Sequence, residues 1–210
     1  MISEEDAAAV LSCYDKLTKK NKESFLKSAQ KASFKAKQTL PLGVAFFIVK
    51  RGTVGAFCVG ESGNEAFAYG VPKESACLVS EQLRYVFSQP TEIVWLTEIG
   101  LESMRSSTLF SAYLADTMKR QEEDLVAHFT AVMFTDVEKR LAGFLYSVAN
   151  RSRTHCIMLT QEEIAKFVGT SREVVTRKLK QWEEEGVVSA ARGKVFIKNK
   201  DLLKKKCALR

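Results

Sequence analysis

Four polar side chains that can recognise the edges of base pairs lie close together in the C-terminal part of the chain. They are Arg172, Glu173, Thr176 and Arg177, at the start of a segment with helical spacing. Arginine pairs bidentately with guanine, and glutamate accepts a hydrogen bond from the cytosine amino group. A solvated helix face usually carries scattered Lys and Glu, whereas planar and short groups gathered at one end are typical of a recognition helix. The pattern therefore predicts contacts in a DNA major groove.

The neighbouring residues predict the helix-turn-helix that would position these groups. Thr160 and Glu163 have the spacing of a capping box, which starts a short helix. Gly169 ends that helix, and Ser171 offers an N-cap for the second one. The apolar residues of the second helix follow helical spacing and are expected to pack inward: Val174, Val175, Leu179 and Trp182.

Two short runs with a strand-like pattern follow, on either side of an Ala-Arg-Gly-Lys turn at 191–194. They predict a wing with Arg192 and Lys194 at its tip. Residues 151–210 contain 15 Lys or Arg and 7 Asp or Glu, a net charge of +8, whereas residues 1–150 carry 17 and 18, a net charge of −1. The basic excess therefore lies in the segment that would meet DNA phosphates.

The N-terminal half follows a different pattern. From Ser33 to Glu98, short apolar runs alternate with reversals marked by glycine, which predicts a small sandwich or barrel. The clearest expected strands are 44–50, 53–60, 65–70 and 92–98. Residues 4–30 instead have apolar residues at helical intervals, with Asn21 interrupting them, and predict short helices.

A stretch without Gly or Pro, 106–134, predicts one long helix. Six of its residues alternate four and three apart, the a/d spacing of a coiled coil: Leu114, Met118, Gln121, Leu125, His128 and Val132. A helix packed on its own domain needs a broader apolar face, whereas polar members such as Gln121 and His128 can set the register of a helix pair. We therefore expect a homodimer seam here, followed by a separate helix at 137–149.

This order of elements resembles the cyclic-AMP receptor protein and fumarate–nitrate regulator (Crp-Fnr) family of bacterial transcription factors. The resemblance covers essentially the whole chain and is strongest from Leu159 to Ile197, where Thr-Ser-Arg-Glu-Val-Val-Thr-Arg matches the family's recognition helix. It implies an α+β fold in three parts. Residues 1–105 would form N-terminal helices and an effector-type β-barrel (jelly roll) like those that bind cyclic nucleotides. A long dimerisation helix at 106–134 and a winged helix-turn-helix at 135–210 would follow.

The resemblance also implies roles for residues and partners. Arg172, Glu173 and Arg177 would read bases, with Thr176 adjacent. Thr160, Ser171, Arg192 and Lys194 would contact phosphates. The implied partners are a second copy of the chain, double-stranded DNA with a palindromic site, and RNA polymerase. No apolar stretch reaches membrane-spanning length, the N-terminus is acidic, and the five scattered cysteines suit reduced thiols, so we expect a cytoplasmic protein without a membrane partner.

The implied effector site departs from the family pattern. Cyclic-nucleotide members carry a Gly-Glu step that holds the ribose and an Arg that holds the phosphate. The corresponding stretch here, 70–84, has no Gly-Glu pair and places Glu81 and Gln82 about where the Arg should be. A buried cyclic phosphate without Arg or backbone amides would be an uncompensated charge. We therefore expect no useful binding of cyclic AMP, with Arg84 or Lys73 as the substitutes to consider.

Other ligands and functions remain as alternatives. Cys13 is the only cysteine before Cys58, so the cysteine cluster of the oxygen-sensing branch is missing and we expect no iron–sulfur cluster and no metal site. Haem bound through His128, or another small ligand, stays an alternative, and the effector is otherwise unidentified.

Neither histidine, His128 nor His155, has a nucleophile pattern beyond the Cys156 that follows His155 in the expected loop, so we expect no enzyme. A winged helix used as a protein-interaction module is the second candidate function. It would normally expose apolar or aromatic residues where this chain has Arg172, Glu173 and Arg177.

Overall fold

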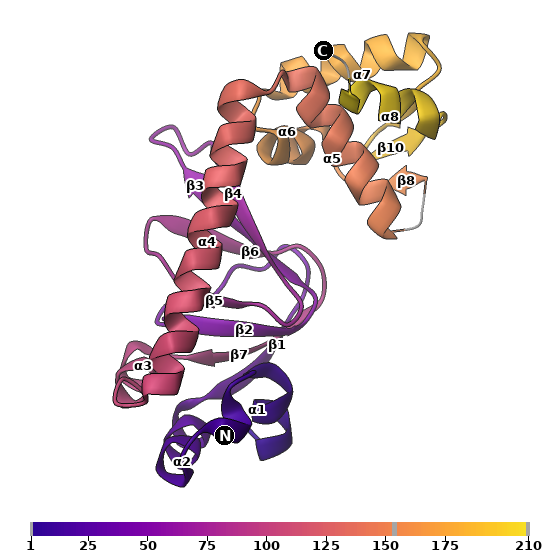
Figure 1. Cartoon of the computed structure of the whole chain (residues 1–210). Helices are drawn as coiled ribbons and strands as arrows, with labels where there is room; N and C mark the ends of the chain where they lie inside the picture. Colours follow the sequence, from indigo (N-terminus) through magenta and orange to yellow (C-terminus); the bar gives the residue numbers. More distant parts are fainter. Residues whose placement is uncertain (1, 153–154, 209–210) are drawn as a thin grey trace. The chain divides into compact units, whose positions relative to one another are not determined.

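The computed structural model describes residues 2–152 and 155–208, and Figure 1 shows its helices and strands. One unit extends to Val126 but leaves out Glu65–Phe67, and a second unit combines Glu65–Phe67 with the residues from Ala127 onward. The division therefore falls inside the long helix, whose last turns pack with C-terminal residues.

The N-terminal helices are α1 (Glu4–Val10), the 3-10 turn η1 (Tyr14–Lys16) and α2 (Lys19–Ser28). Each α-helix begins at a hydroxyl cap: Ser3 accepts from the Asp6 N–H, and Thr18 accepts from the Asn21 N–H. Because Thr18 caps α2, Asn21 lies in its first turn. The prediction that Asn21 interrupts the helical pattern was therefore wrong. The break between the two helices lies before Thr18.

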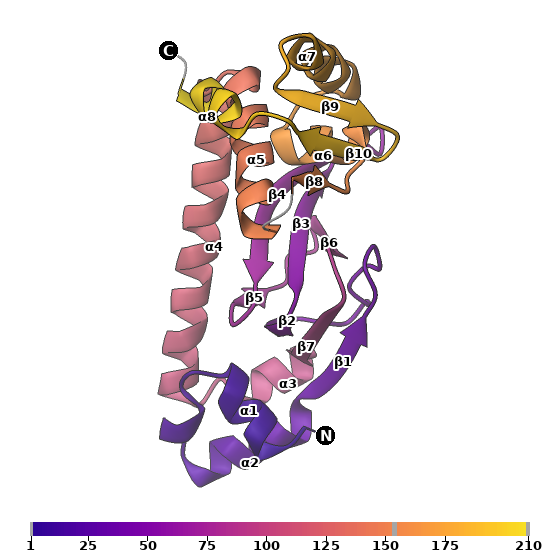
Figure 2. The same ribbon diagram turned by 90° about the vertical axis from the view of Figure 1, so that its right-hand side faces the viewer.

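Two sheets face each other in the first unit (Figure 2). One has the strand order β1 (Gln30–Phe34), β7 (Thr91–Leu96), β2 (Phe46–Arg51) and β5 (Ala76–Leu78). The other has the order β4 (Glu65–Pro72), β3 (Thr53–Val59) and β6 (Leu83–Phe87). Buried residues from both sheets share one core, including Phe47 and Val49 from β2, Val54 from β3, and Tyr85 and Phe87 from β6.

The predicted jelly-roll architecture is confirmed, although the sheets face each other instead of closing into a barrel. The four expected strands correspond to β2, β3, β4 and β7. The turn between β2 and β3 requires glycine, since Gly52 has φ +96° and a Cβ there would lie 2.3 Å from Thr91 Oγ1. Strands β1, β5 and β6 were not individually predicted, because they are short and lack a complete alternating pattern.

Helix α3 (Glu98–Ser103) leads into α4 (Thr108–Phe134), which confirms the long helix predicted at 106–134. Ser107 starts α4, since its hydroxyl accepts from the Phe110 N–H at 3.3 Å. Phe110 and Thr117 are buried on the side of α4 that faces its own unit. The opposite side of α4 is exposed along most of its length.

The second unit contains α5 (Val137–Ser152), α6 (Gln161–Val168), α7 (Arg172–Glu184) and α8 (Lys200–Ala208). A small sheet with the order β8 (Cys156–Ile157), β10 (Lys194–Ile197) and β9 (Val188–Ala191) completes it. Cys156, expected in a loop, thus lies in a strand. Across residues 2–152 and 155–208, no helix combines the length and the apolar character that crossing a membrane requires.

Candidate nucleic-acid interface

The first helix of the helix-turn-helix, α6, begins with a complete capping box. The Glu163 N–H donates to Thr160 Oγ1 at 3.1 Å, and the Thr160 N–H donates to Glu163 Oε2 at 2.8 Å. Two of the N–H groups that a helix start leaves unpaired are thereby satisfied. Ile164, Ala165 and Val168 form its buried face.

A tight turn joins α6 to α7. Gly169 caps α6 in the left-handed region, with φ +68°, and its N–H donates to the Ala165 carbonyl. Ser171 then caps α7, its hydroxyl accepting from the Val174 N–H at 3.4 Å. The helix-turn-helix predicted from these local signals is confirmed, because each signal acts through contacts within a few residues.

The four predicted base-reading side chains are all exposed on the first two turns of α7: Arg172, Glu173, Thr176 and Arg177. Thr176 Oγ1 lies 2.8 Å from the Arg172 carbonyl and 2.6 Å from Gln161 Oε1, so it is tied to α6. The pKa of Glu173 lies below its usual range because its own backbone N–H and the Ser171 hydroxyl donate to the carboxylate and Arg172 is close. Glu173 is therefore an ionised acceptor at neutral pH.

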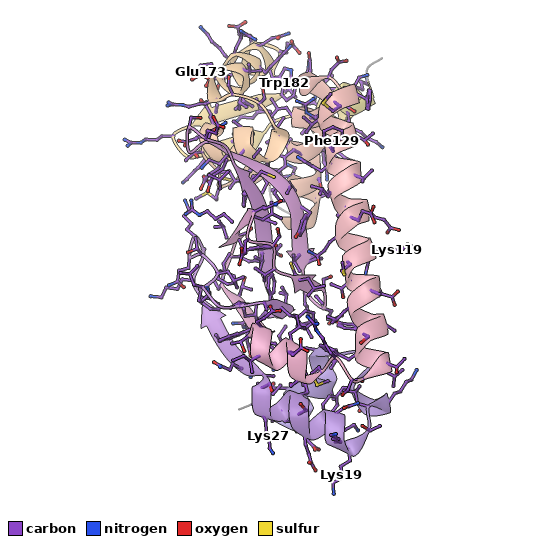
Figure 3. The ribbon with its side chains drawn as sticks, turned by 90° about the vertical axis from the view of Figure 1, so that its left-hand side faces the viewer. Lys19, Lys27, Lys119, Phe129, Glu173 and Trp182 are labelled. Atoms are coloured by element: carbon purple, nitrogen blue, oxygen red, sulfur yellow. The ribbon has the colours of Figure 1, made fainter. Side chains whose placement is uncertain are left out.

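The opposite face of α7 is anchored in the core of the second unit. Val175, Leu179 and Trp182 are buried there, and Figure 3 labels Trp182 and the exposed Glu173 on this one helix. The Trp182 indole N–H donates to Glu138 Oε1 at 3.2 Å, and Lys178 Nζ donates to Glu138 Oε2 at 2.8 Å. These contacts tie α7 to the start of α5 and hold its exposed face in a fixed orientation.

The C-terminal lysines 204–206 lie in α8 and are not simply a solvated tail, as a short basic run usually is. Lys206 Nζ lies 2.6 Å from Glu185 Oε2 and 5.3 Å from the centre of the Trp182 ring. The side chain of Lys206 is only 12% exposed, so this lysine is part of the support behind α7.

The predicted wing is confirmed as the β9–β10 hairpin. Gly193, with φ +72°, makes its turn, and Arg192 and Lys194 are exposed beside it. A groove of about 510 Å³ lies between the wing and the two helices of the helix-turn-helix. Thr160, Arg172 and Arg192 are among the residues that line it. Three predicted DNA-contacting residues from three elements are therefore brought together.

Four of the six predicted seam residues contact the same chain, and the dimer seam itself stays a prediction. Leu114 packs against the N-terminal core, and Gln121 hydrogen-bonds to the first unit. Val132 lies close to Gly169 in the second unit. The half-buried His128 packs edge-on against Phe67, with 5.4 Å between ring centres. Alternating spacing marks an apolar face but does not say whether that face contacts the same chain or another.

A different stripe of α4 is exposed and apolar, and it includes two predicted seam residues. We call it the α4 stripe; its members are Met118 (59% exposed), Leu125 (43%), Val126 (55%), Phe129 (60%) and Met133 (59%). Spacings of seven, eight, eleven and fifteen residues from Met118 place them on one side of the helix. Figure 3 labels Phe129 on α4. Exposed apolar side chains gathered on one side of a helix are a feature of interaction surfaces.

The inside of the first unit is occupied by its own polar groups. Gln121 Nε2 donates to Tyr69 Oη at 2.8 Å and to the Leu78 carbonyl at 3.0 Å, and Gln121 Oε1 accepts from the Leu78 N–H at 2.9 Å. Tyr69 Oη lies 3.2 Å from Tyr85 Oη. Burial raises the pKa of the neighbouring Cys77 thiol to about 12, so the thiol stays protonated and unreactive.

A cavity of about 100 Å³ remains between β4, the loop before β5, and α4. Its lining includes Tyr69, Gly70, Ser75, Arg120, Gln121 and Asp124. The two cations considered as phosphate partners lie elsewhere: Arg84 lines a separate groove, and Lys73 pairs with Glu74 at 2.8 Å. Arg120, which the sequence did not single out, is the cation beside this cavity. Among the described residues, no group of three His, Cys, Asp or Glu is placed to hold a metal ion.

Comparison with known proteins finds relatives of this architecture. The model of the Crp-like helix-turn-helix domain matches residues 139–206, which contain the capped helices and the wing described above. The cyclic AMP receptor protein of Thermus thermophilus is 29% identical over 170 residues, covering 77% of this chain and 79% of that protein. Residues 139–206 form a Crp-like helix-turn-helix domain, and over most of its length the chain is similar to Crp-Fnr transcription regulators.

Solved Crp-Fnr structures agree on the fold of the whole chain. A regulator of this family from Eubacterium rectale has a TM-score of 0.89 at 20% identity, covering 95% of this chain and 99% of its own. A second regulator, from Thermus thermophilus, has a TM-score of 0.68 at 18% identity, covering 86% and 100%. At these identities the similarity establishes the shared fold, and the properties of each regulator remain its own.

Proposed function

We propose that this protein acts as a homodimer that reads an inverted DNA repeat through α7, without a cyclic nucleotide as effector. One observation carries the proposal: Arg172, Glu173 and Arg177 are exposed on the first turns of a capped and anchored helix, beside a basic wing. A protein-interaction helix would present apolar or aromatic groups at these positions.

Each exposed group has a distinct role in this proposal. Arg172 and Arg177 each have the fork geometry that pairs with guanine O6 and N7. Glu173, held ionised, accepts from a cytosine amino group and repels wrong acceptors. Ser171, Thr160, Arg192 and Lys194 contact phosphates and fix the position of the helix without reading sequence.

Base-reading and phosphate-contacting residues are expected to respond differently to substitution. Arg172→Ala or Arg177→Ala should weaken binding to the preferred site by about 1–3 kcal/mol and relax sequence preference at one position per half-site. Lys194→Ala should weaken binding to all DNA sequences by the same factor. It should also reduce the slope of log K against log salt by roughly 0.9 per phosphate contact. Titration of the preferred and scrambled duplexes at several salt concentrations measures both effects.

Lys180→Ala is the matched control, because Lys180 is an exposed cation farther along the same helix. It should leave sequence preference unchanged. An Arg172→Ala variant that keeps the full wild-type preference would remove Arg172 from the reading surface.

The α4 stripe supports the homodimer. Five exposed apolar side chains on one side of a helix are costly in water, and pairing two copies of α4 would bury them together. A chain with one recognition helix gains from this arrangement, because a two-fold dimer engages two half-sites at once.

The interior of the first unit supports an effector other than a cyclic nucleotide, or none. Small-molecule sites usually measure about 300–1,000 Å³. The cavity beside α4 measures about 100 Å³, and the Gln121 amide already bonds to the strands that a ligand would have to contact. The Thermus relative is named for cyclic AMP; the small size of this cavity and the bonded Gln121 amide argue against the same ligand here.

Calorimetric titration with cyclic AMP and cyclic GMP is expected to show no binding up to about 1 mM, a dissociation constant that corresponds to roughly 4 kcal/mol. The DNA-binding activity of the same preparation serves as the control for correctly folded protein. A micromolar dissociation constant would contradict the prediction. Arg120, the cation that lines the cavity, would then be the first residue to replace.

A further inference from the structure

Arg140, near the start of α5, binds four backbone carbonyls at once. Its Nε donates to Val168 O at 2.9 Å, and its Nη2 donates to Gly169 O at 3.1 Å. Its Nη1 donates to Val132 O at 2.9 Å and also contacts the Thr135 carbonyl. One guanidinium therefore spans two segments that are more than thirty residues apart in the sequence.

The four carbonyls belong to the C-terminal ends of two helices. Val132 and Thr135 mark the end of α4, and Val168 and Gly169 mark the end of α6. The last carbonyls of a helix have no partner within it and carry partial negative charge. A cation placed between two such ends satisfies both, although burial holds the pKa of Arg140 below its usual range.

Gly169 strengthens the same junction from the other side. A Cβ added at Gly169 would lie 3.0 Å from a methyl group of Val132, so the turn of the helix-turn-helix approaches the last turn of α4 very closely. Gly169 allows the close approach because it has no side chain. The guanidinium of Arg140 then holds the end of α6 against the end of α4.

We propose that Arg140 is a positioning residue that fixes the helix-turn-helix on the end of α4, and so sets the half-site spacing that the dimer accepts. The inference rests on the proposed function, since it takes α4 as the dimer helix and α7 as the reading helix. Helix α7 follows α6 directly through the Gly169 turn. Each added base pair moves one half-site by about 3.4 Å and turns it by roughly 34° about the DNA axis, which a rigid junction cannot follow.

Arginine suits this position better than lysine. The guanidinium presents five N–H donors in a fixed plane, whereas the ammonium group of lysine is a single point on a flexible stem. Lysine at this position keeps the charge but cannot reach four carbonyls together. The pair Arg140→Lys and Arg140→Met thus separates the loss of the donor fork from the loss of charge.

The experiment measures the affinity of the full chain for a series of duplexes. Each duplex carries the preferred half-site as an inverted repeat, with centres separated by the best spacing or by one or two base pairs more or less, and one duplex carries a single half-site. We expect the wild type to prefer one spacing by at least about tenfold. Arg140→Met should reduce that preference to about threefold or less while changing single half-site affinity by no more than about twofold. Arg140→Lys should fall between them.

Lys139→Met is the matched control, since it removes the same charge from the adjacent residue, which pairs only with Asp136 at 3.8 Å among the ion pairs described. It should keep the wild-type spacing preference. General destabilisation lowers the affinity for every duplex by the same factor, so the ratio between spacings reports positioning. If Arg140→Met does not fold, the same measurements are made with Arg140→Lys and Gly169→Ala.

Two failures are distinguishable. A wild type that binds no inverted repeat overturns the proposed function and this inference with it. A wild type that prefers one spacing, combined with Arg140 variants that keep the same preference, overturns only the role of Arg140.

Discussion

Phe129→Lys is expected to turn the dimer into a monomer. Phe129 lies in the middle of the α4 stripe and is 60% exposed in the single chain. Burying one such side chain contributes about 1.5–3 kcal/mol, and a two-fold interface contains each residue twice. Lysine removes that contribution and brings two like charges together. Sedimentation velocity at micromolar concentration should show a dimer for the wild type and a monomer for the variant.

The same substitution should weaken binding to an inverted repeat by about a hundredfold or more, because the two half-sites are no longer engaged together. Thr130→Lys is the control: Thr130 is exposed and adjacent in sequence, but it lies outside the stripe. That variant should remain dimeric. A wild type that is already monomeric at micromolar concentration would exclude α4 as the dimer helix.

Trp182→Ala is expected to reduce the free energy of unfolding of the second unit by a large amount. Trp182 is fully buried, and its indole contacts both Glu138 and Lys206. Removing a buried aromatic side chain of this size costs about 3–5 kcal/mol, because the surrounding core cannot close the cavity. Urea denaturation followed by circular dichroism should show an earlier transition, and DNA binding should be lost.

The chain contains two tryptophans, so Trp95 in β7 remains as a fluorescence reporter for the first unit of the variant. Its transition is expected to stay close to that of the wild type. Lys180→Ala, an exposed change on the same helix, should shift neither transition by more than about 0.5 kcal/mol. A Trp182→Ala variant as stable as this control would contradict the packing described for α7.

The helix-turn-helix could be predicted because its signals are local. The Thr160 and Glu163 capping box, the Gly169 cap and the Ser171 cap each act within a few residues, and the structure contains all of them. The apolar spacing of Val175, Leu179 and Trp182 likewise predicted which face of α7 is buried. The side chains left on the other face are the predicted base readers, although contact with DNA remains a prediction.

Features that depend on distant parts of the chain could not be predicted in the same way. The spacing along α4 did not show that Gln121 bonds to the strands of its own unit, because its partners are 43 to 52 residues away. The role of Arg140 could not be predicted either, since its described hydrogen bonds go to backbone carbonyls, which no residue type reveals. Lys206 belongs to a short basic run, which is usually a solvated tail, whereas in the structure it packs against Trp182.

Selection of binding sites from a pool of random double-stranded DNA tests the central claim most directly. The account predicts that the wild-type chain, without added cyclic nucleotide, enriches an inverted repeat with G·C pairs in each half-site and half-site centres about 34–36 Å apart. It also predicts that Arg172→Ala loses preference at one position in each half-site. Enrichment of no palindrome, or of the same palindrome by the wild type and Arg172→Ala, would contradict sequence reading by α7.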